Sequence, residues 1–196
     1  MNVTIIGTGN MARGIATRML EGGNSVILIG HQPGDAENLA EELQESASGG
    51  TSVTSAENRL EGDVVILAVP YSAAGSIVQE YGDRLEGKII IDITNPVDFS
   101  TMDPAVPAGT SAAEEIAEAA PDGASVVKAF NTTFAGTLVE GEVAGQTLDV
   151  LIAGGDAEAK ATVASLVEAG GLRAVDASLL KRARQLEAVG LLHMAL

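Results

Sequence analysis

Short runs of β-branched and other apolar residues alternate with longer segments rich in Ala, Glu and Leu along the whole 196-residue chain. This alternation is typical of parallel strands that are joined by helices. Several of the runs are apolar at consecutive positions, which indicates strands covered by helices on both faces. We therefore expect a doubly wound, mostly parallel α/β sheet with a C-terminal helix, built as a single domain over residues 1–196.

The pattern also predicts where the individual elements lie. Strands are expected at residues 2–6, 25–29, 52–54, 64–69, 88–93, 125–129, 148–153 and 172–175. Helices are expected at residues 11–21, 35–45, 73–81, 112–119, 157–169 and 179–196. Residues 98–109 form the longest segment without periodicity, which is consistent with either a functional loop or a plain surface connection.

Composition excludes several classes of protein. Eleven Lys and Arg against 27 Asp and Glu give a net charge of −16, so we expect no nucleic-acid or anionic-membrane partner. The charge fits either a high-salt cytoplasm or plain solubility. With no cysteine and two histidines the chain is expected to hold no metal. No secretory signal and no apolar run of about 20 residues is visible, which predicts a cytoplasmic protein.

The sharpest motif is G-x-G-x-x-A, directly after the first predicted strand and at the start of the first predicted helix. In such a motif the first glycine permits a tight turn, the second lets the backbone approach a pyrophosphate, and the small third residue lets helix and strand pack closely. Backbone N–H groups at the helix start would then face the phosphates. This Rossmann fingerprint is made of Gly7, Thr8, Gly9, Asn10, Met11 and Ala12.

The end of the second predicted strand bears on the choice of dinucleotide. NAD-binding domains usually carry an acidic residue there, about 20 residues after the glycines, to bind the ribose hydroxyls. Here the sequence reads Gly30-His31-Gln32, without a carboxylate. His31 and Gln32 are donors that suit a 2′-phosphate, so we expect NADP(H) to be preferred over NAD(H), although the usual arginine is absent as well.

Three later strand ends are expected to complete the cofactor site. In open α/β sheets ligands bind at the carboxyl ends of the strands. Phe130 and Phe134 follow the sixth strand in a polar setting, where they either wall a pocket for a planar ligand or pack in the core. The residues assigned to the cofactor at these strand ends are Ala68, Val69, Pro70, Tyr71, Asn95, Pro96, Ala129, Phe130 and Asn131.

Four segments, GTGNMA, LAVPYSA, IIIDITNP and VKAFNTTFAGTL, resemble in order and spacing the NADPH-dependent F420 reductase family, whose Rossmann domain is related to that of the STEAP ferric reductases. The resemblance covers nearly the whole chain. It implies hydride transfer between NADPH and a deazaflavin or flavin, with cofactor contacts at residues 8–11 and the nicotinamide near Val69, Pro70 and Ala129. The chain departs from the family at Gly30-His31-Gln32, where basic or hydroxyl residues often hold the 2′-phosphate.

We therefore expect an oxidoreductase whose small-molecule partner is a planar hydride acceptor, F420 first and a flavin or quinone second. Hydride transfer between stacked rings needs orientation more than proton chemistry, so no catalytic side chain is assigned. A non-catalytic NADP(H) sensor or scaffold is the alternative. A third interpretation is a hydroxy-acid or imine reductase that uses an acid–base residue, for which Lys128 and Asp92 are the candidates near the crevice.

The C-terminal segment, residues 178–196, carries an apolar helical stripe beside a basic cluster. Such a stripe either packs on the sheet or is covered by a second subunit. We expect a homodimer interface there.

Overall fold

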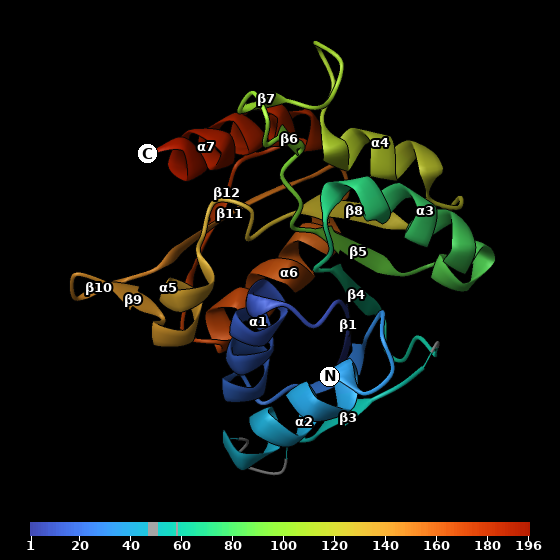
Figure 1. Cartoon of the computed structure of the whole chain (residues 1–196), viewed down its shortest axis with the longest axis vertical. Coiled ribbons are helices and arrows are strands. Elements are labelled where there is room, and N and C mark those ends of the chain that lie inside the picture. The colour runs from blue at the N-terminus through green and yellow to red at the C-terminus, as the bar shows by residue number, and fades with distance from the viewer. Residues whose placement is uncertain (47–50, 58) are drawn as a thin grey trace.

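The computed structural model describes residues 1–46, 51–57 and 59–196. Its centre is an eight-stranded sheet in the order β3-β2-β1-β4-β5-β8-β11-β12 (Figure 1). Strand β11 runs antiparallel to β8 and parallel to β12, whereas the six strands from β3 to β8 are parallel to one another. The strands are β1 (Asn2–Ile6), β2 (Ser25–Ile29), β3 (Val53–Ser55), β4 (Val64–Leu67), β5 (Ile89–Asp92), β8 (Ser125–Lys128), β11 (Asp149–Gly154) and β12 (Arg173–Asp176). The expected mostly parallel, doubly wound α/β sheet is confirmed.

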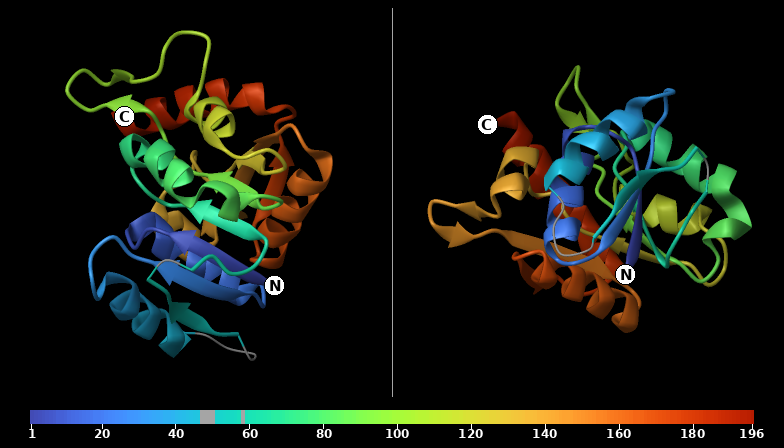
Figure 2. Two further views of the ribbon diagram at one scale, coloured as in Figure 1. Left: turned by 90° about the vertical axis from the view of Figure 1, so that its right-hand side faces the viewer. Right: turned by 90° about the horizontal axis from the view of Figure 1, so that it is seen from below.

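Helices cover both faces of this sheet (Figures 1 and 2). Because side chains alternate between the faces of a strand, Val64 and Ile66 pack with the α1, α2, α5 and α6 layer, and Val65 and Leu67 with the α3 and α4 layer. Helix α7 lies across the end of the sheet beside the loop of residues 96–110, as Figure 2 shows. The helices are α1 (Asn10–Glu21), α2 (Asp35–Ser46), α3 (Tyr71–Tyr81), α4 (Ala112–Ala119), α5 (Ala135–Glu140), α6 (Ala157–Ala169) and α7 (Ala183–Ala195).

Most predicted boundaries hold within one or two residues, which is the usual uncertainty of helix and strand ends. Strand β4 ends at Leu67 and α3 begins at Tyr71, because Pro70 occupies the N-cap with the fixed φ that suits a helix start. The C-terminal helix is preceded by a 3₁₀ turn, η2 (Leu180–Arg182), and a second one, η1 (Gly82–Leu85), follows α3.

Two hairpins were not expected from the sequence. The aperiodic segment contains the short antiparallel pair β6 (Val97–Asp98) and β7 (Asp103–Pro104), which is closed by a turn in which Met102 has φ of 59°. Helix α5 is followed by a second pair, β9 (Glu142–Val143) and β10 (Gln146–Thr147). Two-residue strands leave too few residues for a period-2 pattern, so alternation could not reveal them.

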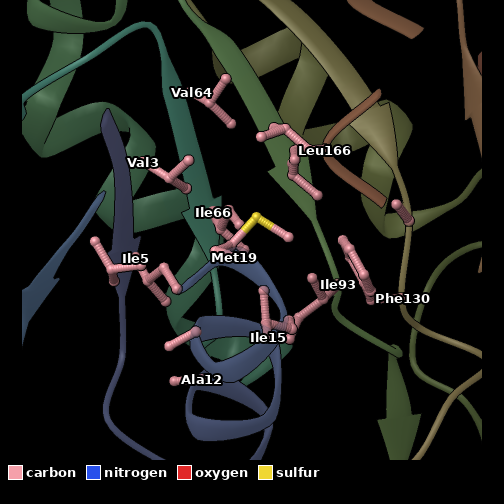
Figure 3. Close-up of a cluster of buried hydrophobic side chains, with 14 of the residues drawn as sticks. Val3, Ile5, Ala12, Ile15, Met19, Val64, Ile66, Ile93, Phe130 and Leu166 are labelled. Atoms are coloured by element: carbon pink, nitrogen blue, oxygen red, sulfur yellow. The ribbon is translucent and has the colours of Figure 1, made fainter. Parts of the chain in front are cut away.

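The larger apolar core lies between the sheet and α1 (Figure 3). Ile15 and Met19 of α1 point toward Val3 and Ile66 of the central strands, and Ala12 lets the first turn come close to the sheet. This packing fixes the start of α1 relative to the strand ends that surround it. No helix within the described part of the chain is long and apolar enough to cross a membrane.

Candidate cofactor and acceptor site

The carboxyl ends of β1 and β4 meet at Gly7. This residue has φ of +119°, and a Cβ atom there would lie 2.1 Å from the carbonyl oxygen of Ala68. Its N–H donates to the carbonyl of Ile29 at 2.8 Å, so the turn also ties β1 to β2. Only glycine fits this conformation and this spacing, as the sequence predicted.

The N-terminus of α1 is open to solvent directly beyond this turn. Gly9 is the N-cap and makes no side-chain capping hydrogen bond. A Cβ atom at Gly9 would meet no atom within 4 Å, so the backbone borders open space. The first N–H groups of a helix have no intrahelical acceptors and carry the positive end of its dipole. The helix start is therefore suited to an anionic group such as a pyrophosphate.

Two adjoining pockets lie beside the end of β2. One, of about 210 Å³, is lined by Gly7, His31, Val69 and Tyr81 among others, and the second, of about 270 Å³, includes His31 and Gln32. His31 thus borders both pockets. His31 therefore lines the same pocket as Gly7, and Gln32 lines the second pocket.

These two pockets also contain acidic groups that sequence reasoning missed. Glu57 lines both of them, Glu80 lines the first and Glu37 the second, and neither has Lys or Arg among its described lining residues. Glu57 follows β3, a strand only three residues long, so no strong sequence pattern marked its position. A carboxylate at this position would repel the 2′-phosphate of NADP(H).

A further pocket of about 180 Å³ lies on the other side of the α1 N-terminus. It combines Met11 of the fingerprint with the residues that follow β5 and β8 and with the last turns of α7. Its lining residues are Met11, Ile93, Asn95, Asn131, Thr132, Thr133, Phe134, Gly190, His193 and Met194. We call it the acceptor pocket. The sequence assigned Met11, Asn95 and Asn131 to a common site, but the contribution of α7 was not foreseen.

The wall of the acceptor pocket is held by a pair of asparagines. The Asn131 amide nitrogen donates to Asn95 Oδ1 at 2.9 Å and to the Leu186 carbonyl at 2.9 Å, and the Asn95 amide donates to the Asn131 carbonyl at 2.8 Å. A Cβ atom at Gly190 would lie 2.5 Å from Asn95 Oδ1, so this glycine permits α7 to approach. Asn131 is 4% exposed and its Oδ1 atom has no hydrogen-bond partner. A buried amide oxygen without a partner is ready to accept a donor from a ligand.

The two phenylalanines of this segment have different roles. Phe130 is buried in the core (Figure 3) and has φ of 62°, which is rare for an aromatic residue. Its carbonyl accepts the Thr133 hydroxyl at 2.7 Å, which holds the turn after β8. Phe134, by contrast, is half exposed and lines the acceptor pocket. Of the two alternatives that the sequence left open, core packing describes Phe130 and a pocket wall describes Phe134. Ala129 is buried, like Phe130.

Tyr71, the first residue of α3, contacts α4, and the segment before it borders the glycine turn. The Tyr71 hydroxyl donates to a Glu115 carboxylate oxygen at 2.6 Å. Burial, and secondarily this hydrogen bond, raises the pKa of Tyr71 to about 12. Its phenol is therefore directed to α4, whereas the carbonyl of Ala68 lies against Gly7 and Val69 lines the pocket with His31.

Lys128 and Asp92 form a buried ion pair. The Lys128 ammonium lies 2.7 Å from Asp92 and 2.8 Å from Glu187 of α7, and it also donates to the Thr94 carbonyl. Both Lys128 and Asp92 are fully buried. Buried in this way, their charged ends cannot contact a substrate, which removes the support for acid–base chemistry at these two residues.

Glu187 completes this cluster from α7. Its carboxylate also accepts the N–H groups of Ala112 and Ala113 at the start of α4. Burial raises the pKa of Glu187, and the nearby Lys128 opposes that shift. The cluster joins α7 to the sheet and to α4, so it holds the back of the acceptor pocket in place.

The glycine turn, the open helix start and the pockets at the carboxyl edge of a parallel sheet define a Rossmann-type dinucleotide-binding protein. A family model described as NADP oxidoreductase, coenzyme F420-dependent, matches residues 2–96. The F420-dependent NADP reductase of Methanocaldococcus jannaschii is 30% identical over 96% of this chain and 89% of its own length. The chain belongs to the F420-dependent NADP reductase family.

Three further proteins are also similar to the chain. Metalloreductase STEAP3 of Rattus norvegicus is 33% identical over 96% of this chain, and the chain spans 36% of the length of that protein. The crystal structure of a putative F420-dependent NADP reductase from Arthrobacter sp. FB24 is similar with a TM-score of 0.83 and 27% identity, over all of this chain and 92% of the other. A hypothetical protein of Sinorhizobium meliloti gives a TM-score of 0.80 at 30% identity, over 92% of this chain and 86% of the other.

Proposed function

We propose that this protein transfers hydride between NADP(H) and a planar acceptor, with F420 as the first acceptor and a flavin as the second. The observation that carries the proposal is the position of the acceptor pocket. It shares Met11 with the fingerprint, and it is walled by the residues after β5 and β8. In open α/β sheets ligands bind in the crevice at the carboxyl ends of the strands.

The described residues fit an NADP(H) molecule in extended form. The open backbone at Gly9 and the start of α1 would hold the pyrophosphate. His31 and Gln32 would bind the adenosine end, and the unpartnered Oδ1 of Asn131 would accept the carboxamide N–H of the nicotinamide. When bound, the nicotinamide supplies the hydride, and the protein's part is to orient the two rings against each other.

The names of the relatives support F420 as the first acceptor to test. Two relatives from methanogens are named F420-dependent NADP reductases. The half-exposed ring of Phe134 also offers a planar acceptor an aromatic surface. Phe134 lies on the same pocket as Asn131, so a ring stacked there would be near the nicotinamide end of the site.

The test is NADPH oxidation followed at 340 nm with F420, FMN, FAD and a quinone in turn. We expect turnover with F420 and slower turnover with flavins. The Gly9→Val variant serves as the matched control, because it should fold and lose NADPH binding. Tight NADPH binding without turnover of any acceptor would contradict the proposal and favour a non-catalytic sensor.

A further inference from the structure

We propose that His193 is the proton donor of the acceptor pocket and that it protonates the anion that hydride transfer leaves on the acceptor. This inference rests on the proposed function and extends it, because hydride transfer alone leaves a negative charge on the acceptor. His193 lies in the last turn of α7, far from the fingerprint in sequence, and no motif marked it.

The position of His193 is fixed by the preceding turns of α7. Leu186 accepts the Asn131 amide, Glu187 pairs with Lys128, and Gly190 packs against Asn95. These contacts hold the axis of α7 against the strand ends. One turn further on, the His193 ring borders the acceptor pocket opposite Phe134, with the ring centroids 6.3 Å apart and tilted by 35°.

Three other polar side chains of this pocket donate hydrogen bonds to groups within the protein. The Asn95 and Asn131 amides donate within the protein, and the Thr133 hydroxyl donates to the Phe130 carbonyl. Thr132 also lines the pocket, but its hydroxyl is not acidic enough to give up its proton at neutral pH. Among the described lining residues His193 is the one with an imidazole, the side chain that most often transfers protons in enzyme sites.

Neighbouring charged groups do not replace it. Lys128 is fully buried behind the pocket wall, where Asp92 and Glu187 surround its ammonium. Met11 on α1, Ile93 after β5 and Phe134 at the N-cap of α5 are the uncharged residues that these elements present to the pocket. His193 is itself exposed, so solvent can return a proton to it after each turnover.

The chemistry balances with one external proton. The C–H bond of the reduced nicotinamide breaks with its electron pair, and a new C–H bond forms on the acceptor, or an N–H bond if the acceptor is a flavin. The nicotinamide is oxidised and the acceptor becomes a reduced anion. The imidazolium N–H of His193 then breaks, and its proton forms an N–H bond on that anion. Water reprotonates the imidazole.

The first test compares pH profiles at saturating NADPH with F420 as acceptor. The chain has two histidines, His31 and His193. We expect kcat of the unchanged protein to fall as pH rises from about 5.5 to 8.5, where histidine loses its proton. His193→Gln should flatten this profile and lower kcat at pH 6 by at least about tenfold. His31→Gln should keep the pH dependence, and Lys181→Gln, at an exposed position of η2, should keep both rate and profile.

The second test uses binding rather than turnover. In the His31→Gln variant the remaining histidine is His193, so its ring resonances are assigned directly in an NMR spectrum. We expect oxidised F420, added to the NADP⁺ complex, to shift these resonances and to change their titration midpoint. FMN is the second probe.

The outcomes separate the two proposals. Turnover with F420 whose pH profile does not depend on His193, or ring resonances unmoved by bound F420, overturns the inference and leaves the proposed function in place. NADPH binding without turnover of F420 or any flavin overturns the proposed function, and the inference falls with it. A pH profile lost in His193→Gln together with a shifted resonance supports both.

Discussion

The ammonium of Lys128 at the end of β8 lies 2.8 Å from the carboxylate of Glu187 on α7, with both side chains buried. This contact joins the C-terminal helix to the centre of the sheet. Asp92 is the second carboxylate on the same ammonium, so removing the cation would leave two acidic groups in the interior.

Lys128→Met is therefore expected to lower the free energy of unfolding by about 3–5 kcal/mol, the usual effect of breaking a buried ion pair from one side. Urea unfolding followed by circular dichroism measures it. Lys160→Met is the matched control, because Lys160 pairs with a largely exposed Asp176 and its loss should cost much less. Equal losses in the two variants would mean that the buried cluster contributes no special stability.

The two glycines of the fingerprint should respond in opposite ways. Gly9→Val is expected to fold normally, because its Cβ atom meets open space, but to lose several kcal/mol of dinucleotide affinity. Gly7→Ala should instead destabilise the fold, because its Cβ atom would overlap the Ala68 carbonyl. Calorimetry with NADPH and thermal unfolding distinguish the two effects. A Gly9→Val protein with unchanged affinity would remove the fingerprint from the site.

Cofactor choice depends on charge around His31. We predict tighter binding of NADP(H) than of NAD(H), and His31→Asp should reverse that preference. Glu57 lines both pockets beside the end of β2, so Glu57→Lys should raise NADPH affinity by about tenfold, roughly 1.4 kcal/mol, and leave NADH affinity nearly unchanged. Glu118→Lys makes the same charge change on the exposed surface of α4. Titration calorimetry that finds NADH bound as tightly as NADPH by the unchanged protein would refute the preference.

We predict that α7 forms the interface of a homodimer. Ala183 and Leu186 of its apolar stripe are buried within the chain, but Val189 and Leu192 are exposed, Leu192 to 57%. An exposed leucine beside other apolar side chains on a helix is typical of a surface that a second copy covers. Light scattering at micromolar concentration should give a dimer, and Leu192→Asp should give a monomer. A monomeric unchanged protein would end this expectation.

The raised pKa of Tyr71 predicts a pH dependence of stability. Burial and the hydrogen bond to Glu115 raise its pKa to about 12 in the folded chain, compared with about 10 when unfolded. The unfolded chain therefore loses the phenolic proton first, so the stabilisation is complete below pH 10 and declines as pH rises from about 10 to 12. Urea midpoints between about pH 9 and 11 should fall less steeply in Tyr71→Phe than in the unchanged protein. Parallel slopes would contradict the assignment.

The sequence predicted the sheet well because strands and helices leave local periodic patterns. Consecutive apolar residues in Val64–Leu67 marked a strand buried on both faces, and all four side chains are buried. The glycine turn was predictable for the same reason, since its requirement for φ above zero at Gly7 is a property of the local backbone. The strand-end positions of Asn95 and Asn131 likewise follow from the local pattern, because each residue lies within a few positions of the end of a recognisable strand.

Contacts between distant segments could not be read in this way. The bond from Asn131 to Leu186 spans 55 residues, and the one from Ala112 to Glu187 spans 75. Both depend on how α7 packs across the sheet edge, and no local pattern encodes that direction. Tertiary packing alone therefore decided that Lys128 is sealed in the interior, that Phe130 is core while Phe134 lines a pocket, and that His193 meets the residues after β8. The chain's sequence determined the glycine turn and the start of α1, where one local motif suffices. The fold determined the pocket between α1 and α7, because its walls come from segments that only long-range packing brings together.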